Sequence, residues 1–393
     1  MHKLAATIML SITIAVTTGC WNKLELTDWG FVQAAAIDET ADGRIRLTSQ
    51  VYKPGGSDKP SMEASQGSTF IDIINENETV YGASLDATNE LGRNLQWSHM
   101  RVLLISEDIA RHKNIGELLD FFSRTHEPRG TVAILITNGA ASPYLTLKPL
   151  IESTMGQQLK SIEQLAHDQS SKTLEVTLTD VFKLSKEPFS TLTIPYVSRV
   201  KEAQEVATVS GIAVLNFPEG KISSIIPSER TPYLLMLMDQ YKGGLITIPC
   251  SGPNKDAPSS YDSFRVNKLH TSLNPSLRND KLFLQIRIVM EGTVGELSCS
   301  RTISEAEIKD FTTRIKQKVE KQIRDTFVYI QKQKADVIGI GIELHRWHNS
   351  LWKTWKPDWK EHFAESDFTI DVDVSLISTG VYAGKPFSAN SNK

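Results

Sequence analysis

Apolar and polar residues alternate most regularly toward the C-terminal end of the chain. Every second position is apolar between residues 282 and 290, and the same period returns between 368 and 376. A period of two sends alternate side chains to opposite faces of a strand. Each segment therefore predicts a strand with one buried face and one face in water.

A different spacing, in steps of three and four residues, lies between these two segments. The sequence Ser304-Glu305-Ala306-Glu307 has the form of a capping box, which starts a helix. The apolar stripe that follows consists of Ile308, Phe311, Ile315, Val319, Ile323, Phe327 and Ile330. This spacing predicts a long amphipathic helix over residues 304–334, about 40 Å in length, whose stripe needs a sheet to cover it.

The first half of the chain mixes both periods. Alternation at 31–37 and 45–51, with turn residues between, predicts a β-hairpin. Buried strands are expected at 100–105 and 131–137, joined by a helix that Ser106 caps. Strand, helix and strand over this length indicate a βαβ unit, and therefore parallel neighbours in one sheet.

Shorter patterns complete the predicted elements. Helices are expected at 79–95, 149–167, 179–184 and 232–241, an extended segment at 192–200, and a second hairpin from 209–216 and 221–226. Residues 54–67, rich in Gly, Pro and Ser, are expected to form an exposed loop. The predicted fold is α+β (mixed α/β), with several domains and mixed sheets against which helices pack.

Two segments are expected to separate these domains. Lys201 to Glu205 is charged, and Ser251 to Ser260 is rich in Pro, Ser and Gly. We therefore expect an N-terminal α/β domain over 20–200, a middle region over 205–260, and a C-terminal α/β domain over 261–386 that contains the long helix.

The amino terminus has the layout of an export signal. A short basic start precedes an apolar run over Leu4 to Val16, and small residues lead to Cys20. The run is shorter than the roughly 20 residues that a membrane-spanning helix needs. We predict a lipoprotein signal peptide over 1–19, cleaved before Cys20, whose sulfur carries a diacylglycerol with acyl chains such as palmitate. The alternative is a plain secretory signal that ends near a cysteine.

Charge and cysteine content narrow the possibilities. The 43 basic and 46 acidic residues nearly balance, so no overall field indicates nucleic-acid binding. With Cys20 acylated, Cys250 and Cys299 remain. They could form a disulfide in an exported protein, or remain as buried free thiols.

Motifs for catalysis or metal binding are not found in the sequence. There is no phosphate-binding loop, no GxSxG elbow and no HExxH pair. His345, His348 and His362 do not combine with a cysteine or carboxylate cluster at metal-binding spacing, so we expect no metal and no other cofactor. The glycines of Gly339-Ile340-Gly341 are interpreted as a bend that closes the long helix.

Four tryptophans near the C-terminal end are the most unusual feature of the composition. Trp347, Trp352, Trp355 and Trp359 are interleaved with lysine and arginine. Three interpretations remain open: an anionic membrane surface, a protein interface, or packing of the last helix onto the sheet.

The order of several short segments resembles that of the Ger(x)C spore-germination lipoproteins. The segments are Gly19-Cys20-Trp21 with Glu25-Leu26, Ser98-His99, Gly211-Ile212-Ala213-Val214, Ile338-Gly339-Ile340-Gly341, and Thr379-Gly380. The resemblance implies a non-enzymatic C subunit of a nutrient germinant receptor. It also implies a position on the outer face of the spore inner membrane, beside the A and B subunits of that receptor.

Two other functions compete with this expectation. A solute-binding lipoprotein that captures a small nutrient would need two lobes around a polar cleft. An exported hydrolase would need a catalytic constellation, and none is recognisable in the sequence.

Overall fold

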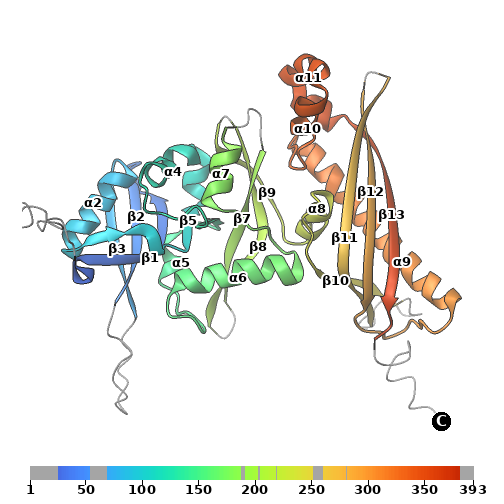
Figure 1. Cartoon of the computed structure of the whole chain (residues 1–393), viewed down its shortest axis with the longest axis horizontal. Helices are drawn as coiled ribbons and strands as arrows, with labels where there is room; N and C mark the ends of the chain where they lie inside the picture. Colours follow the sequence, from blue (N-terminus) through green and yellow to red (C-terminus); the bar gives the residue numbers. More distant parts are fainter. Residues whose placement is uncertain are drawn as a thin grey trace, which may run out of the picture.

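Two β-sheets with helices packed against them make up the fold (Figure 1). The computed structural model describes residues 25–53, 69–186, 191–201, 204–217, 219–250, 260–279 and 281–380. The predicted signal peptide, Cys20 and the loop predicted at 54–67 lie outside these residues.

Within the described residues, nine strands form the large sheet, in the order β3-β2-β1-β5-β6-β7-β8-β9, with β4 beside the start of β1. Their bounds are β1 Trp29–Glu39, β2 Ile45–Tyr52, β3 Phe70–Asn77, β4 Asn94–Gln96, β5 Val102–Ser106, β6 Ala133–Thr137, β7 Thr191–Lys201, β8 Glu205–Asn216 and β9 Lys221–Ile226. The central strands β1, β5, β6 and β7 are parallel, and antiparallel pairs flank them on both sides.

Helices cover both faces of the large sheet. They are α2 Val80–Leu91, α3 Glu107–His112, α4 Ile115–Arg124, α5 Ser142–Leu145, α6 Met155–Ser170 and α7 Leu178–Leu184. Every residue of β5 and β6 is buried. Leu103 packs in the same core as α3 and α4, whereas Leu104 packs with α5 and α6 on the opposite face. The continuous apolar runs of these strands follow from burial on both sides.

The small sheet has the order β10-β11-β12-β13, with strands at Gly244–Pro249, Tyr261–Arg278, Lys281–Val294 and Asp367–Ser378. Helix α9, Glu305–Lys332, lies across one face of it (Figure 1). From Phe311 to Ile330 the predicted stripe of α9 is buried, while Ile308 is half-buried. Burial alternates along β12, as the period of two predicts.

Of the remaining helices, one joins the two sheets and three short ones follow α9 along the chain. Helix α8, Thr231–Leu237, contacts α9 and β11, so that one hydrophobic core continues from the large sheet into the small one. Helices α10, α11 and α12 span Ile340–Trp347, Asn349–Trp355 and Trp359–Ala364. Three short 3-10 helices complete the elements: η1 Leu26–Asp28, η2 Trp97–His99 and η3 Lys356–Asp358.

The predicted mixed α/β fold is confirmed, with corrections to several boundaries. The helix predicted over 79–95 ends at Leu91, because Gly92 adopts a left-handed conformation with φ +66, and Leu95 belongs to β4. The helix predicted over 149–167 begins only at Met155, capped by Thr154. The helix predicted over 232–241 ends at Leu237.

Of the two segments expected to separate domains, one lies in the large sheet and the other lies almost wholly outside the described residues. The segment 201–205 lies between β7 and β8, which are hydrogen-bonded neighbours, so the large sheet continues across it. Residues 251–259 lie outside the described part of the chain. The division into three regions therefore stays a prediction. Within the described residues, no helix is both long and apolar enough to cross a membrane.

Candidate functional site: the cleft between the sheets

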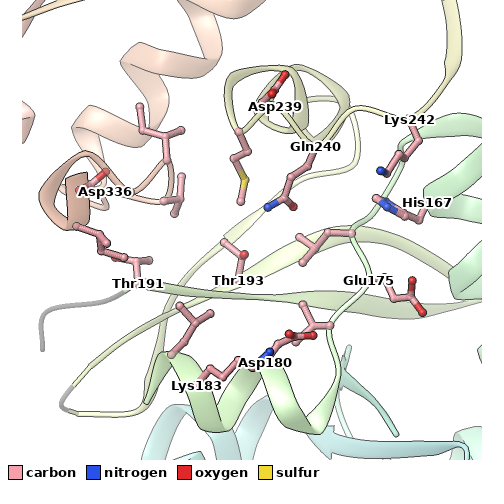
Figure 2. A pocket seen from close by; sticks show the side chains of 18 residues that line it. His167, Glu175, Asp180, Lys183, Thr191, Thr193, Asp239, Gln240, Lys242 and Asp336 are labelled. Atoms are coloured by element: carbon pink, nitrogen blue, oxygen red, sulfur yellow. The ribbon is translucent and has the colours of Figure 1, made fainter. Parts of the chain in front are cut away.

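A cleft of about 720 Å³ opens where the large-sheet region meets the segments around the small sheet (Figure 2). Three stretches of chain supply its walls. The large-sheet region contributes the end of α6, the segment 174–176, α7 and the start of β7. Residues 238–242 follow α8, and residues 336–342 join α9 to α10. Sequence patterns did not predict this convergence, because it depends on how distant elements pack.

Ser171 fixes one wall of the cleft. This buried residue ends α6 in a left-handed conformation, with φ +46. Its hydroxyl accepts hydrogen bonds from the backbone N–H groups of Lys242 at 3.0 Å and Gly243 at 3.2 Å, and it donates to the Gly243 carbonyl at 2.8 Å. Three hydrogen bonds to one side chain therefore tie the segment after α8 to the end of α6.

The residues just before this tie orient the second wall. Asp239 has φ +56, and its carboxylate accepts a hydrogen bond from the Thr271 backbone N–H at 2.7 Å. Asp239 Oδ2 lies 3.1 Å from Nδ1 of His270. Figure 2 shows Asp239 turned away from the cleft and Gln240 pointing into it. Gln240 is therefore a polar group available to a bound molecule.

Asp336 organises the third wall. Its carboxylate accepts hydrogen bonds from the N–H groups of Ile340 at 3.0 Å and Gly341 at 2.6 Å, and from Trp359 Nε1 at 3.2 Å. Burial raises the pKa of the Asp336 carboxyl, and these N–H donors act in the opposite direction. A single carboxylate thereby joins the start of α10 to α12.

This arrangement corrects the interpretation of the glycine pair. The long helix ends at Lys332, and Gly339, with φ +78, is the residue just before the next helix, α10. A Cβ at Gly341 would lie 2.8 Å from Trp359 Nε1, closer than real contacts allow. The left-handed backbone explains Gly339, and the close approach of Trp359 and Asp336 explains Gly341.

Most acidic groups that line the cleft already have a partner. Glu175 lies 2.6 Å from Lys160 Nζ, and Asp180 completes the capping box of α7 with Thr177. The basic residues Lys183 and Lys242 belong to no ion pair found within the described residues. His167 Nδ1 lies 3.1 Å from the Thr173 carbonyl. The cleft thus suits the binding of a small polar molecule, and its described side chains form no nucleophile and base pair.

Packing accounts for three of the four tryptophans. Trp352, Trp355 and Trp359 are buried, with exposed fractions of 4%, 7% and 6%, whereas Trp347 is 77% exposed. The ring centroids of Trp352 and Trp359 are 5.4 Å apart, in an edge-to-face arrangement. Trp355 stacks on His362 at 4.4 Å. An interface role for this cluster stays a prediction, for which Trp347 is the accessible side chain.

Cys250 and Cys299 form a disulfide, with their Cα atoms 5.9 Å apart. Behind the disulfide lies the buried Asp262, which the sequence analysis missed. Its carboxylate accepts hydrogen bonds from the N–H groups of Ser298 and Cys299 and from the Ser300 hydroxyl. An Asp at an inward position of a strand pattern was the signal that could have revealed it.

Cys250, Asp262 and Cys299 also have to be considered as possible metal ligands. In the described part of the chain, the group of metal-ligating side chains that come close together is Cys250, Asp262 and Cys299. Both sulfurs are committed to the disulfide. The structure does not gather His345, His348 and His362 into such a group among the described residues.

Comparisons with known proteins cover nearly the whole chain. Residues 22–199 match the family model described as "Spore germination protein N-terminal domain". Residues 210–380 match the one described as "Spore germination B3/ GerAC like, C-terminal". One match ends at residue 199, within β7, and the other begins at residue 210, within β8.

Individual relatives agree with these matches. Spore germination protein KC of Bacillus subtilis (strain 168) is 21% identical over 411 residues, which cover 97% of each chain. Spore germination protein B3 of the same organism is 23% identical, over 92% of this chain and 94% of that protein. The crystal structure of the GerBC protein superposes with a TM-score of 0.59 at 21% identity, over 87% of this chain and 96% of that one. That structural likeness shows the fold.

Proposed function

Because this chain belongs to the GerAC-like family of spore germination proteins, we propose that it is the C subunit of a nutrient germinant receptor. The observation that carries the proposal is the presence of both family domains in one chain, in order, over residues 22–199 and 210–380. The family is one of germination proteins and not of enzymes, in agreement with a cleft built for binding.

A lipid on Cys20 would hold the subunit at the outer face of the spore inner membrane. Cys20 lies two residues before the first family match, at the end of a sequence with the layout of a lipoprotein signal. Two acyl chains give stable membrane attachment, at roughly 0.8 kcal/mol for each buried methylene group. The body needs no spanning helix of its own.

Anchoring would also promote assembly with the A and B subunits. Confining the body to a thin layer raises its effective concentration near membrane partners, so that weak contacts suffice. The exposed indole of Trp347 is the side chain of the tryptophan cluster that a partner could reach.

The test is Cys20→Ala in spores, with Asn22→Ala as a matched control in the same segment. We expect the cysteine variant to leave the membrane fraction and the germination response to nutrients to fall, while the control behaves as wild type. A normal response from unlipidated protein in the soluble fraction would contradict the proposal.

The polar cleft supports a second candidate, a lipoprotein that captures a small solute. The cleft volume of about 720 Å³ lies in the usual range for small-molecule sites. Calorimetry of the protein with candidate nutrients tests this function directly. Binding that weakens in Gln240→Ala and Lys242→Ala would favour solute capture, whereas no heat with any nutrient would argue against it.

A further inference from the structure

A smaller pocket, of about 320 Å³, lies at the amino ends of β5 and β6. Four basic side chains and one acidic side chain, that of Glu175, line the pocket. His99 and Arg101 precede β5, Arg129 precedes β6, and Lys160 reaches it from α6. The hydroxyl-bearing Thr131 also lines the pocket. Basic groups and hydroxyl donors around one hollow suit an anion.

The charges of this pocket are not balanced internally. Lys160 Nζ lies 3.0 Å from Glu163 and 2.6 Å from Glu175, so this lysine is neutralised by its neighbours. No ion pair within the described residues involves Arg101 or Arg129. Both arginines are exposed. Two exposed arginines therefore line the pocket, and neither forms an ion pair in the described part of the chain.

The position of the pocket relates it to the proposed anchor. Strands β1, β4, β5 and β6 are parallel, so all four begin toward the same end of the large sheet. We call this end, where the parallel strands begin, the amino edge of the sheet. The Arg101 N–H donates to the Gln33 carbonyl of β1 at 2.9 Å. Strand β1 begins at Trp29, nine residues after Cys20. Nine residues span at most about 30 Å, so a lipid on Cys20 would keep this edge near the headgroups.

We infer that the Arg101 and Arg129 pocket binds the phosphate of an anionic phospholipid headgroup, and that the amino edge of the large sheet faces the membrane. The inference rests on the proposed lipid anchor for its geometry. Guanidinium groups bind phosphate through two parallel N–H bonds. A tether alone leaves the body free to rotate. A second contact at this edge would fix its orientation and determine which surfaces the membrane subunits meet.

Vesicle flotation tests the inference without the acyl chains. Cys20→Ser is introduced into the full chain as a common background, so every protein compared keeps the same leader. Arg101→Gln with Arg129→Gln removes the two pocket charges. Arg111→Gln with Arg124→Gln removes two charges from α3 and α4, outside the pocket, as the matched control.

We expect the pocket variant to bind vesicles of phosphatidylcholine and phosphatidylglycerol about 30-fold more weakly than the background protein, since each basic group at an anionic surface contributes roughly a factor of five. The control variant should change much less. Arg101→Lys with Arg129→Lys should retain only part of the binding, because it keeps the charge but loses the paired N–H donors of the guanidinium groups. Pure phosphatidylcholine should not distinguish the proteins.

Two results would overturn the inference. One is an equal loss of binding in the pocket and control variants, which would mean only a general charge effect. The other is binding of inorganic phosphate that the pocket variant loses while its binding to the anionic vesicles stays equal to that of the background protein, which would indicate a site for a free anion. The lipid on Cys20 is examined separately, by mass spectrometry, so a failure of the anchor and a failure of the pocket are distinguishable.

Discussion

The two sheets of this protein are buried in different ways. The central strands of the large sheet are covered by helices on both faces, and β5 and β6 have no exposed residue. The small sheet is covered by α9 on one face, and burial alternates along β12. One chain therefore contains two kinds of core. In the first kind every strand residue is buried, and in the second only alternate residues are.

A buried carboxyl group has a raised pKa in the large-sheet region and a lowered pKa beside the small sheet. On α6, burial raises the pKa of the Glu163 carboxyl to about 7, against the lowering effect of Lys160 at 3.0 Å. Beside the small sheet, burial of Asp262 also favours the neutral form. There, however, hydrogen bonds from Ser300 and from backbone N–H groups prevail and lower the pKa of Asp262. The number of hydrogen-bond donors to each carboxylate therefore decides whether burial raises its pKa or the donors lower it.

The largest effect is expected from the disulfide, which links two segments beside the small sheet. Cys250→Ala with Cys299→Ala opens a link between residues 49 positions apart. Loop-closure entropy gives a loss of about 4 kcal/mol in the free energy of unfolding. Denaturant unfolding measures it, followed by fluorescence of the tryptophans. A change below about 1 kcal/mol would show that the link is not needed.

Neighbouring substitutions in one strand give the sharpest contrast between the sheets. Leu103→Ala and Leu104→Ala should each cost about 3 kcal/mol, because both side chains are fully buried, on opposite faces of β5. In β12, Ile288→Ala should cost about the same, but Val289→Ala, at a side chain 37% exposed, less than about 1 kcal/mol. Equal losses at Ile288 and Val289 would refute the one-sided burial of the small sheet.

The buried acids predict opposite responses to pH. Glu163 has a raised pKa in the folded state, so its contribution to stability is fully present below the pKa of the unfolded chain and is lost as the pH rises through about 7. Glu163→Gln should remove this loss, on the order of 2 kcal/mol between pH 5 and pH 8. Thermal unfolding across this range measures it.

Asp262→Asn is expected to change the pH dependence of stability in the direction opposite to that of Glu163→Gln. Its lowered pKa means that Asp262 stabilises the protein above the pKa of an unfolded aspartate, and that this contribution is lost as the pH falls through the folded pKa. The variant should therefore be less stable than wild type at neutral pH and approach it in acid. If Glu163→Gln and Asp262→Asn changed the slope of stability against pH in the same direction, the raised pKa of Glu163 and the lowered pKa of Asp262 would be contradicted.

The smallest effects are expected at the helix caps. Ser304→Ala removes the capping box of α9, and Thr79→Ala removes the hydroxyl that accepts the Gly82 N–H in α2. Each should cost about 1 kcal/mol. Hydrogen exchange in the first turn of each helix should rise locally. A global change in exchange after Ser304→Ala would mean that α9 depends on its cap more than on its buried stripe.

Local patterns in the sequence were sufficient to predict many elements of the two sheets, although β3, β4, β10 and β11 were not among them. The alternation at 282–290 and 368–376 became β12 and β13, and the capping box at Ser304 begins α9 as expected. The βαβ unit around β5 and β6 is parallel, as its length required. These features depend on residues close together in the chain, which is why periodicity and caps predict them.

Features that depend on distant contacts were not predictable in this way. Ser171 gives no signal in the sequence, because its role depends on meeting the backbone of Lys242 and Gly243. The glycine pair was misread for the same reason, since Asp336 and Trp359 approach it only in the fold. The cleft and the basic pocket are likewise products of packing between separate elements.

Intact mass spectrometry of the protein isolated from spore membranes tests the central claim most directly. We expect a mature chain that begins at Cys20 and carries the added mass of a diacylglycerol on its sulfur. A chain that begins at Met1, or one cleaved elsewhere with Cys20 unmodified, would contradict the lipid-anchored subunit proposed for this molecule.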